Sequence, residues 1–428
     1  MRQSHKTVYL ERALLAGIVD GDPAPRSEPL EELARLAETA GAEVVAHIVQ
    51  KRDAPGVKYF LGSGKVQQIA AMVEQEKIDV VIFDDDLSPA QIRNLEKEVK
   101  RRVIDRTELI LDIFATHART LQAKLQVELA QMEYTLPRLS RMWTHLGQQA
   151  GGAIGGAIGV RGPGEKQLEV DRRVARRRVH DLKKEIALIE KRKQREVHAR
   201  TLDNYTVSLV GYTNAGKSTL MNALTGAGVL AEDRLFSTLD TRTRLWRLPD
   251  GSKVLLSDTV GFIRNLPTGL VTSFHATLEE VVQADLLLHV VDASDPESER
   301  QIEAVEDVLG KIGAKEKDTI ILFNKSDRLR DNVELTLLSR RHPDALGISA
   351  RTGAGLDVLA ERMAKILASR LVEMDVEIPQ SEGKLLSDLA ANAMVLSRED
   401  GPERVRLRVR APRRFVWKLK QFADGKAV

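Results

Sequence analysis

The sequence has no cysteine among its 428 residues, which excludes a disulfide framework and thiolate metal sites. No apolar run approaches the roughly 20 residues of a membrane-spanning helix, and the longest, 284–293, has the length of a buried strand. The first 20 residues carry charges where a signal peptide has an apolar core. Neither sign of charge is in large excess, since 65 Lys and Arg oppose 62 Asp and Glu. We therefore expect a soluble protein of a reducing compartment, whose affinity for nucleic acid depends on uneven placement of charge.

Length and pattern predict a multidomain α/β protein. At roughly 100–200 residues per domain, the chain has room for about three cores. Apolar runs at 43–50, 79–85 and 102–106 indicate strands, and helical spacing separates them, with Ser88-Pro89 as a helix start. The segment 61–69, LGSGKVQQI, predicts a glycine turn that opens a helix, because it lacks the spacing of a phosphate loop. We expect an N-terminal α/β domain, a helical hairpin, a nucleotide-binding domain and a small α+β domain, at 1–106, 107–200, 201–370 and 371–428.

The hairpin is predicted from two narrow apolar stripes. Residues 107–139 have a wholly helical pattern with apolar steps of four and three, and 168–200 continue the same rhythm. Two helices with one apolar seam each bury those seams against one another as an antiparallel coiled coil. The glycine-rich segment 149–165 would then form its tip. The seam residues are Leu125, Leu129, Met132, Leu136, Leu168, Ala175, Val179, Leu182, Ile186 and Ile189.

Charge is lopsided at this hairpin. Residues 168–200 hold twelve Lys or Arg against six Asp or Glu, and arginine and aromatic residues border the glycine-rich tip. Cations, stacking rings and open backbone amides suit irregular RNA. A solvated helix face and a flexible linker are the alternatives. We expect a partner-binding tip, with RNA-binding candidates at Arg138, Arg141, Trp143, His145, Arg161, Arg172 and Arg173.

A phosphate loop begins at Gly211. The stretch GYTNAGKS, 211–218, matches G-x-x-x-x-G-K-[ST] and lies between an apolar strand, 206–210, and a helix. Lys217 is expected to contact the β- and γ-phosphates, and the Ser218 hydroxyl to bind Mg²⁺. The predicted nucleotide-binding residues of this loop are Gly211, Tyr212, Thr213, Asn214, Ala215, Gly216, Lys217, Ser218 and Thr219.

Three further motifs follow at the ends of strands. DTVG, 258–261, offers Asp258 to Mg²⁺ through water and the Gly261 amide to the γ-phosphate. NKSD, 324–327, places an aspartate, Asp327, that matches the donors of guanine and selects GTP over ATP. Such an order of motifs is what a nucleotide site in an open α/β sheet requires. Asn324 and Lys325 are expected to tie the NKSD loop to the phosphate loop, and Ser349 and the Ala350 amide to contact the guanine carbonyl.

A switch I threonine must lie within 235–244 to sense the γ-phosphate and Mg²⁺. We assign Thr238, with Thr241 and Thr243 as rivals that spacing alone does not exclude. The catalytic set is then Lys217, Thr238 and Gly261.

The residue after DTVG has a mechanistic consequence of its own. Many GTPases have glutamine there to orient the attacking water, but this chain has Phe262. We expect slow intrinsic hydrolysis that a partner surface accelerates. His275 is a possible substitute, although a single helical histidine more often packs or faces solvent.

These stretches, together with RGPGEKQLEVDRR, KYFLGSGKVQQI and MWTHL, resemble the HflX family of translation-associated P-loop GTPases, a relative of the Obg group. The resemblance implies a cytoplasmic, monomeric GTPase that uses Mg²⁺, binds GTP or GDP, contacts rRNA of the large (50S) ribosomal subunit, and splits or rescues ribosomes. The chain departs from the family by a second GGAI unit in the tip, and by Lys166 and Thr241 where Thr and Pro are common.

Other functions stay open. The chain could be a GTP-regulated adaptor of a protease or of a membrane complex, at the membrane periphery, or a ribosome biogenesis factor. ATP-driven RNA remodelling by the N-terminal domain is less favoured, because the sequence has no second complete phosphate loop. In the tail, Arg404, Arg406, Arg408 and Arg410 alternate along a predicted strand, and their face is either solvated or RNA-facing.

Overall fold

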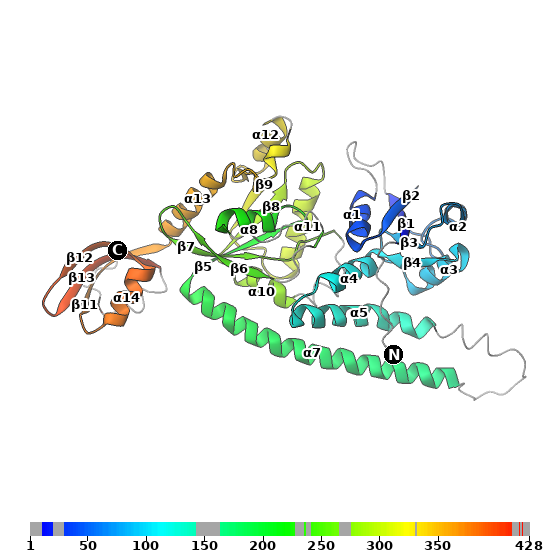
Figure 1. Ribbon diagram of the computed structural model, residues 1–428, viewed down its shortest axis with the longest axis horizontal. Coiled ribbons are helices and arrows are strands. Elements are labelled where there is room, and N and C mark those ends of the chain that lie inside the picture. Colours follow the sequence, from blue (N-terminus) through cyan, green and yellow to red (C-terminus); the bar gives the residue numbers. More distant parts are fainter. Residues whose placement is uncertain are drawn as a thin grey trace, which may run out of the picture.

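The computed structural model describes residues 11–19, 30–142, 163–226, 235–236, 241–264, 275–329 and 332–412, with residues 419 and 422. Three β-sheets and a long helical hairpin make up this part of the chain (Figure 1). The predicted multidomain α/β class is confirmed. Within the described ranges, no helix combines the length and the apolar character needed to cross a bilayer.

The N-terminal sheet has four parallel strands in the order β2-β1-β3-β4. Its apolar strands are covered on both faces by helices, as parallel sheets require. The predicted helix start at Ser88 is confirmed, since its hydroxyl accepts a hydrogen bond from the backbone N–H of Gln91 in a capping box. The elements are β1 (Arg12–Val19), α1 (Glu31–Ala40), β2 (Glu43–Lys51), α2 (Ser63–Gln75), β3 (Val80–Phe83), α3 (Pro89–Val99) and β4 (Arg102–Asp105).

Strand β1 was not predicted from the sequence, although it lies inside the sheet between β2 and β3. Its run RALLAGIV belongs to the first 20 residues, for which the sequence excludes a signal peptide but predicts no strand. The segment at 61–69 does form a glycine turn, because Gly62 is the N-cap residue of α2.

The hairpin differs from the expected single helix in its first arm. The arm is broken into α4 (Arg106–His117) and α5 (Leu121–Met142), and it returns as α7 (Pro163–Asp203). The backbone of Ala118 leaves the helical region at ψ 109°, which ends α4. The predicted seam between α5 and α7 is confirmed by a buried cluster of Leu125, Leu129, Leu182 and Ile186. In Figure 1 the two helices lie side by side, and α7 reaches the central domain.

The central sheet has the order β10-β9-β8-β5-β7-β6, in which only β6 is antiparallel to its neighbour. Helices α8 and α13 pack on one face, and α10 and α11 on the other. The chain runs from β5 to β6 and β7 on one side of β5, and then to β8 on its other side. Strand β5 therefore marks the switch point, where such sheets bind ligands. The elements are β5 (Tyr205–Gly211), α8 (Lys217–Thr225), β6 (Arg242–Arg247), β7 (Lys253–Asp258), α10 (His275–Gln283), β8 (Leu286–Asp292), α11 (Ser298–Lys311), β9 (Thr319–Asn324), η1 (Ser326–Arg328), α12 (Asn332–Arg341), β10 (Leu346–Gly347) and α13 (Leu356–Ser369).

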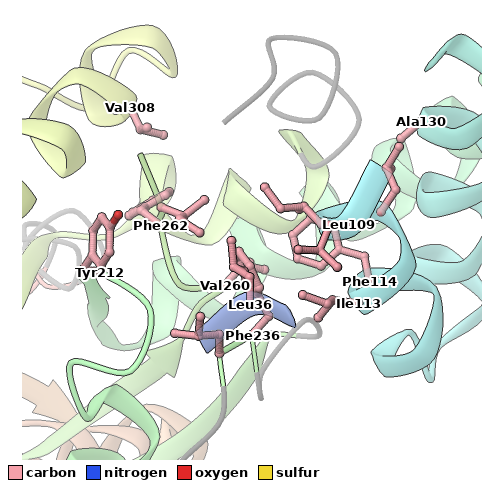
Figure 2. Packing of buried hydrophobic residues seen from close by; sticks show 14 of the residues in the cluster. Leu36, Leu109, Ile113, Phe114, Ala130, Tyr212, Phe236, Val260, Phe262 and Val308 are labelled. Atoms are coloured by element: carbon pink, nitrogen blue, oxygen red, sulfur yellow. The ribbon is translucent and has the colours of Figure 1, made fainter. Parts of the chain in front are cut away.

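The N-terminal and central domains share one hydrophobic cluster (Figure 2). Helix α4 contributes Ile113 and Phe114, and the central domain contributes Phe236 and Phe262. The rings of Phe114 and Phe236 meet edge to face, with centroids 4.6 Å apart and planes at 76°. Such a pair adds about 0.5–1.5 kcal/mol beyond its buried area. Apolar burial therefore holds the two domains together in addition to the connecting hairpin.

The C-terminal unit is an antiparallel sheet, β11-β13-β12, with α14 on its apolar face. The four arginines of β13 share the exposed face, as the alternation predicts, but acidic residues of β11 oppose them. Arg406 donates to Glu377 at 2.8 Å, and Arg408 and Arg410 donate to Glu373 at 2.6 and 3.1 Å. This pairing favours a solvated sheet face over an RNA-binding one. The elements are β11 (Leu371–Pro379), α14 (Gly383–Asn392), β12 (Met394–Asp400) and β13 (Arg404–Pro412).

Candidate nucleotide site

The phosphate loop 211–218 connects β5 to α8 at the switch point of the central sheet. Gly216 has φ +97°, and a Cβ there would lie 2.3 Å from the side-chain nitrogen of Asn324, so both backbone and space require glycine. The Lys217 ammonium donates to the backbone oxygens of Gly211 at 3.0 Å and Tyr212 at 2.8 Å. The loop thus curls around its own lysine and presents the N-terminus of α8 to an anion.

Burial disfavours the charged form of this lysine. Removal from water lowers the pKa of Lys217 to about 8, while the carboxylate of Asp258 partly offsets that effect. The neighbouring Lys325 lowers the pKa further. An anionic phosphate would supply the partner that the buried ammonium needs.

Two of the residues predicted at the Mg²⁺ site, Ser218 and Asp258, adjoin one another. The Ser218 hydroxyl donates to the Asp258 carboxylate over 2.6 Å, although Asp258 ends β7 and Ser218 lies in the first turn of α8. Hydroxyl and carboxylate oxygens are the hard ligands that Mg²⁺ takes alongside phosphate and water. This donor set fits the ion, which would neutralise charge on the phosphates when bound.

The N-K-x-D segment is tied to the phosphate loop as its motif predicts. The Asn324 amide donates to the Ala215 carbonyl at 2.8 Å and accepts from the Ala350 N–H at 2.9 Å. The Ser349 hydroxyl donates to the Asp327 carboxylate at 2.6 Å. These bonds join both predicted base-binding segments, 324–327 and 349–350, to the phosphate loop at the carboxyl ends of the strands.

Lys325 has a partner that the motifs do not include. Its ammonium pairs with Asp292, the last residue of β8, at 2.7 Å. The run HVVDASD places this aspartate at the end of an apolar strand, which is the signal that could have identified it. Asp292 and Lys325 also line a cavity of about 380 Å³ with Asn214 of the phosphate loop.

The backbone of Phe262, the residue after D-x-x-G, is hydrogen-bonded to the phosphate loop. The Thr213 N–H donates to the Phe262 carbonyl at 2.7 Å, and the Phe262 N–H donates to the Gly211 carbonyl at 3.1 Å. The Phe262 side chain is 2% exposed and turns into the interdomain cluster, as Figure 2 shows. The Phe262 ring therefore contributes to the packing between the two domains.

A polar cluster that the sequence did not reveal joins the phosphate loop to α1. The Tyr212 hydroxyl donates to Glu32 and accepts from the Arg264 N–H at 2.8 Å. Glu32 also pairs with Arg106 at 2.7 Å and Arg264 at 3.2 Å. Burial alone would raise the pKa of Glu32, but the charges of Arg106 and Arg264 outweigh it and lower the pKa. These contacts join residues at least 52 positions apart, so no local motif marks them.

Of the three switch I candidates, Thr238 lies outside the described residues. The Thr241 hydroxyl lies between Lys193 of α7, at 2.9 Å, and Glu280 of α10, at 3.0 Å. The Thr243 hydroxyl contacts the same Glu280 at 3.2 Å. The hydroxyls of Thr241 and Thr243 are thus hydrogen-bonded to residues of α7 and α10. Thr238 stays our assignment. His275 opens α10, and its side chain is likewise outside the description.

The predicted RNA-binding residues differ in whether the structure describes them and in how exposed they are. Trp143, His145 and Arg161 lie outside the described residues, and so does the side chain of Arg141. Arg138 is only 20% exposed and pairs with the buried Asp105 at 3.0 Å. We therefore leave Arg138 out of the RNA surface. Arg172 is half-buried on α7, whereas three arginines are exposed on it: Arg173, Arg176 and Arg177.

An open sheet with a phosphate loop at its switch point and an N-K-x-D segment at its edge defines a guanine-nucleotide-binding P-loop GTPase. Comparison with known proteins specifies it further. Four family models match in succession: GTP-binding GTPase N-terminal at 27–115, GTP-binding GTPase Middle Region at 117–200, 50S ribosome-binding GTPase at 206–325, and HflX C-terminal domain at 335–415. The chain belongs to the HflX family of GTPases.

Individual relatives agree with this assignment. The chain is 47% identical to GTPase HflX of Magnetococcus marinus, over 87% of this chain and 86% of the relative. It is 46% identical to GTPase HflX of Escherichia coli, over 90% of both. Among solved structures, a GTP-binding protein from Sulfolobus solfataricus in complex with GDP is 26% identical, with a TM-score of 0.43, over 83% of this chain and 98% of that one.

Proposed function

We propose that this GTPase binds the large ribosomal subunit through its helical hairpin and splits or rescues stalled or idle ribosomes, and that the ribosome stimulates its GTP hydrolysis. Family membership supports the proposal, as does the description of the matched model as a 50S ribosome-binding GTPase. The four predicted domains, the Mg²⁺ ligands Ser218 and Thr238, the base-selecting Asp327, a monomeric state and a cytoplasmic location are part of it.

The exposed arginines of α7 are the observation that carries the RNA contact. Arg173, Arg176 and Arg177 have the i, i+3, i+4 spacing of one helix face and are exposed to solvent. We call them the arginine face. Arg178 points elsewhere and pairs with Glu128 across the hairpin at 2.8 Å. Unlike the arginines of β13, those of the arginine face form no ion pair with the residues that the structure describes. Phosphates of rRNA are its natural counterions.

In the proposed reaction, different residues bind the phosphates and the base of GTP. Lys217 and the N-terminus of α8 hold the phosphates, Gly261 offers its amide to the γ-phosphate, and Asp327 holds the base. Because Phe262 is buried between the domains, it cannot position water. A ribosomal surface that orders the switch segments would therefore raise the rate.

Cosedimentation with purified large subunits tests the binding step. We expect binding with a non-hydrolysable GTP analogue that exceeds binding with GDP. Replacing the arginine face by alanine should weaken it and reduce its salt dependence by roughly two to three units of log Kd per log salt, because three phosphate contacts are lost. A charge-matched control replaces Lys311, Lys315 and Arg340, which are exposed on the central domain. Equal binding by both triple variants would contradict the assigned surface.

A further inference from the structure

Thr213, the third residue of the phosphate loop, carries a hydroxyl that none of the contacts above uses. The residue is only 6% exposed, and its Oγ1 has no hydrogen-bond partner within the described part of the chain. Its backbone N–H, by contrast, is fastened to Phe262. A buried hydroxyl without a partner destabilises a fold, because it has lost its hydrogen bonds to water. Native structures retain such groups where a ligand or water completes the bond.

The position of Thr213 suggests which ligand this is. A Cβ built on Gly261 would lie 2.8 Å from the Cα of Thr213, 3.0 Å from its Cβ, and 3.1 Å from Nζ of Lys217. Thr213 therefore adjoins both groups that handle the γ-phosphate in this class of enzyme, the loop lysine and the D-x-x-G glycine. Any side chain on Gly261 would collide with this arrangement.

Other polar side chains near Gly261 are already engaged. The Thr259 hydroxyl donates to the Leu209 carbonyl at 2.7 Å, and the Ser218 hydroxyl donates to Asp258. The side chain of Phe262 is apolar and faces the interdomain cluster. Of the hydroxyls described here on either side of Gly261, that of Thr213 alone has no protein partner.

We propose that Thr213 is a catalytic residue, whose hydroxyl hydrogen-bonds the attacking water and a γ-phosphate oxygen of GTP. It thereby takes over part of the orienting role for which many GTPases use glutamine. In the reaction, the water oxygen forms a bond to the γ-phosphorus, and the bond from that phosphorus to the β–γ bridging oxygen breaks. GDP leaves with the bonding electrons, and the water's proton goes to phosphate and solvent. The hydroxyl needs no change of charge, only a fixed position.

The proposal rests on the GTPase activity of the family and not on the ribosomal partner, so it is tested without ribosomes. The informative variant is Thr213→Val, which keeps the shape and removes the hydroxyl, and Thr213→Ser restores the hydroxyl. Thr225→Val is the matched control, because the Thr225 hydroxyl donates within its own helix, to the Met221 carbonyl over 2.7 Å. Single-turnover hydrolysis, GDP affinity and affinity for GDP with aluminium fluoride are measured for each.

We expect Thr213→Val to slow single-turnover hydrolysis by at least about tenfold, the equivalent of one lost hydrogen bond in the transition state. Affinity for GDP with aluminium fluoride should fall by the same factor, while GDP affinity stays within about twofold. Thr213→Ser should recover most of the turnover that Thr213→Val loses, and Thr225→Val should hydrolyse GTP at about the original rate. The proposal is overturned if Thr213→Val retains full turnover. It is also overturned if GDP affinity falls in parallel, because the hydroxyl would then only support the loop.

Discussion

At the scale of the residue, Lys217 shows how burial prepares a site for phosphate. Its ammonium is held by two backbone carbonyls and is removed from water, so the charged form is costly until an anion arrives. A bound nucleotide would raise the lowered pKa of about 8 toward its ordinary value. Nucleotide binding and protonation of Lys217 are therefore linked.

This linkage predicts how affinity depends on pH. The free protein loses the Lys217 proton above about pH 8, whereas the complex retains it, so binding above that pH takes up a proton. GDP affinity should be constant from pH 6.5 to 7.5 and fall by up to about tenfold for each pH unit above 8. Titration calorimetry in buffers of different ionisation enthalpy measures both quantities. The Lys217→Met variant controls for titration of guanine itself. A proton uptake of zero at pH 9 in the original protein would exclude the linkage.

The sign for folding is opposite to that for binding. In the absence of nucleotide, the unfolded chain holds the Lys217 proton between pH 8 and about 10.4, where the folded chain has lost it. In that window this group makes the free protein more stable as the pH rises. Between about pH 8 and 10, the melting temperature of the nucleotide-free Lys217→Met variant should therefore rise less with pH, or fall more, than that of the original protein.

At the scale of the element, Asp105 determines how the hairpin leaves the N-terminal sheet. It ends β4, caps α4 by accepting from the Glu108 N–H at 2.9 Å, and binds α5 through Tyr134 at 2.7 Å and Arg138 at 3.0 Å. Burial raises its pKa to about 6 in spite of these bonds. One carboxylate therefore joins a strand end, a helix start and the arm of the hairpin.

Removing that carboxylate should destabilise the protein strongly. In Asp105→Ala the guanidinium of Arg138 loses its buried partner and α4 loses its cap, so we expect a loss of about 3–5 kcal/mol in the free energy of unfolding. Urea denaturation at pH 7.5 measures it. The control is Glu133→Ala, which breaks a more exposed ion pair with Lys183 across the same hairpin and should cost about 0–1 kcal/mol. Similar losses in both variants would show that Asp105 is not the joint described here.

The elements also show what the sequence could and could not predict. Heptad spacing identified the α5–α7 seam, because the pattern of a coiled coil is local. The break at Ala118 was missed, since α4 is buried on most of its sides, polar residues included, and packs into the interdomain cluster. In the site, short motifs identified the phosphate loop and N-K-x-D. They could not show Glu32 beside Tyr212 or Asp292 beside Lys325, because tertiary folding alone brings those pairs together.

At the scale of the whole molecule, helix α7 of the hairpin runs along α5 and extends to the central domain, where it contacts α10 (Figure 1). Near the C-terminal end of α7, Lys193 contacts Thr241, and both contact the buried Glu280 of α10. Thr241 precedes β6, and α10 follows the segment after D-x-x-G. A partner bound along the hairpin would thus have a direct structural route to the residues around the γ-phosphate.

The central claim is that rRNA contacts along the hairpin accelerate GTP hydrolysis in a site that lacks glutamine. It is tested most directly by GTP turnover with and without purified large ribosomal subunits, over a series of salt concentrations. The proteins compared are the original chain, a deletion of residues 151–159, and the arginine-face variant. We predict strong stimulation of the original chain that decreases with salt, and weak stimulation of both variants, with their GDP affinity unchanged. Equal stimulation of all three proteins at every salt concentration would contradict the claim.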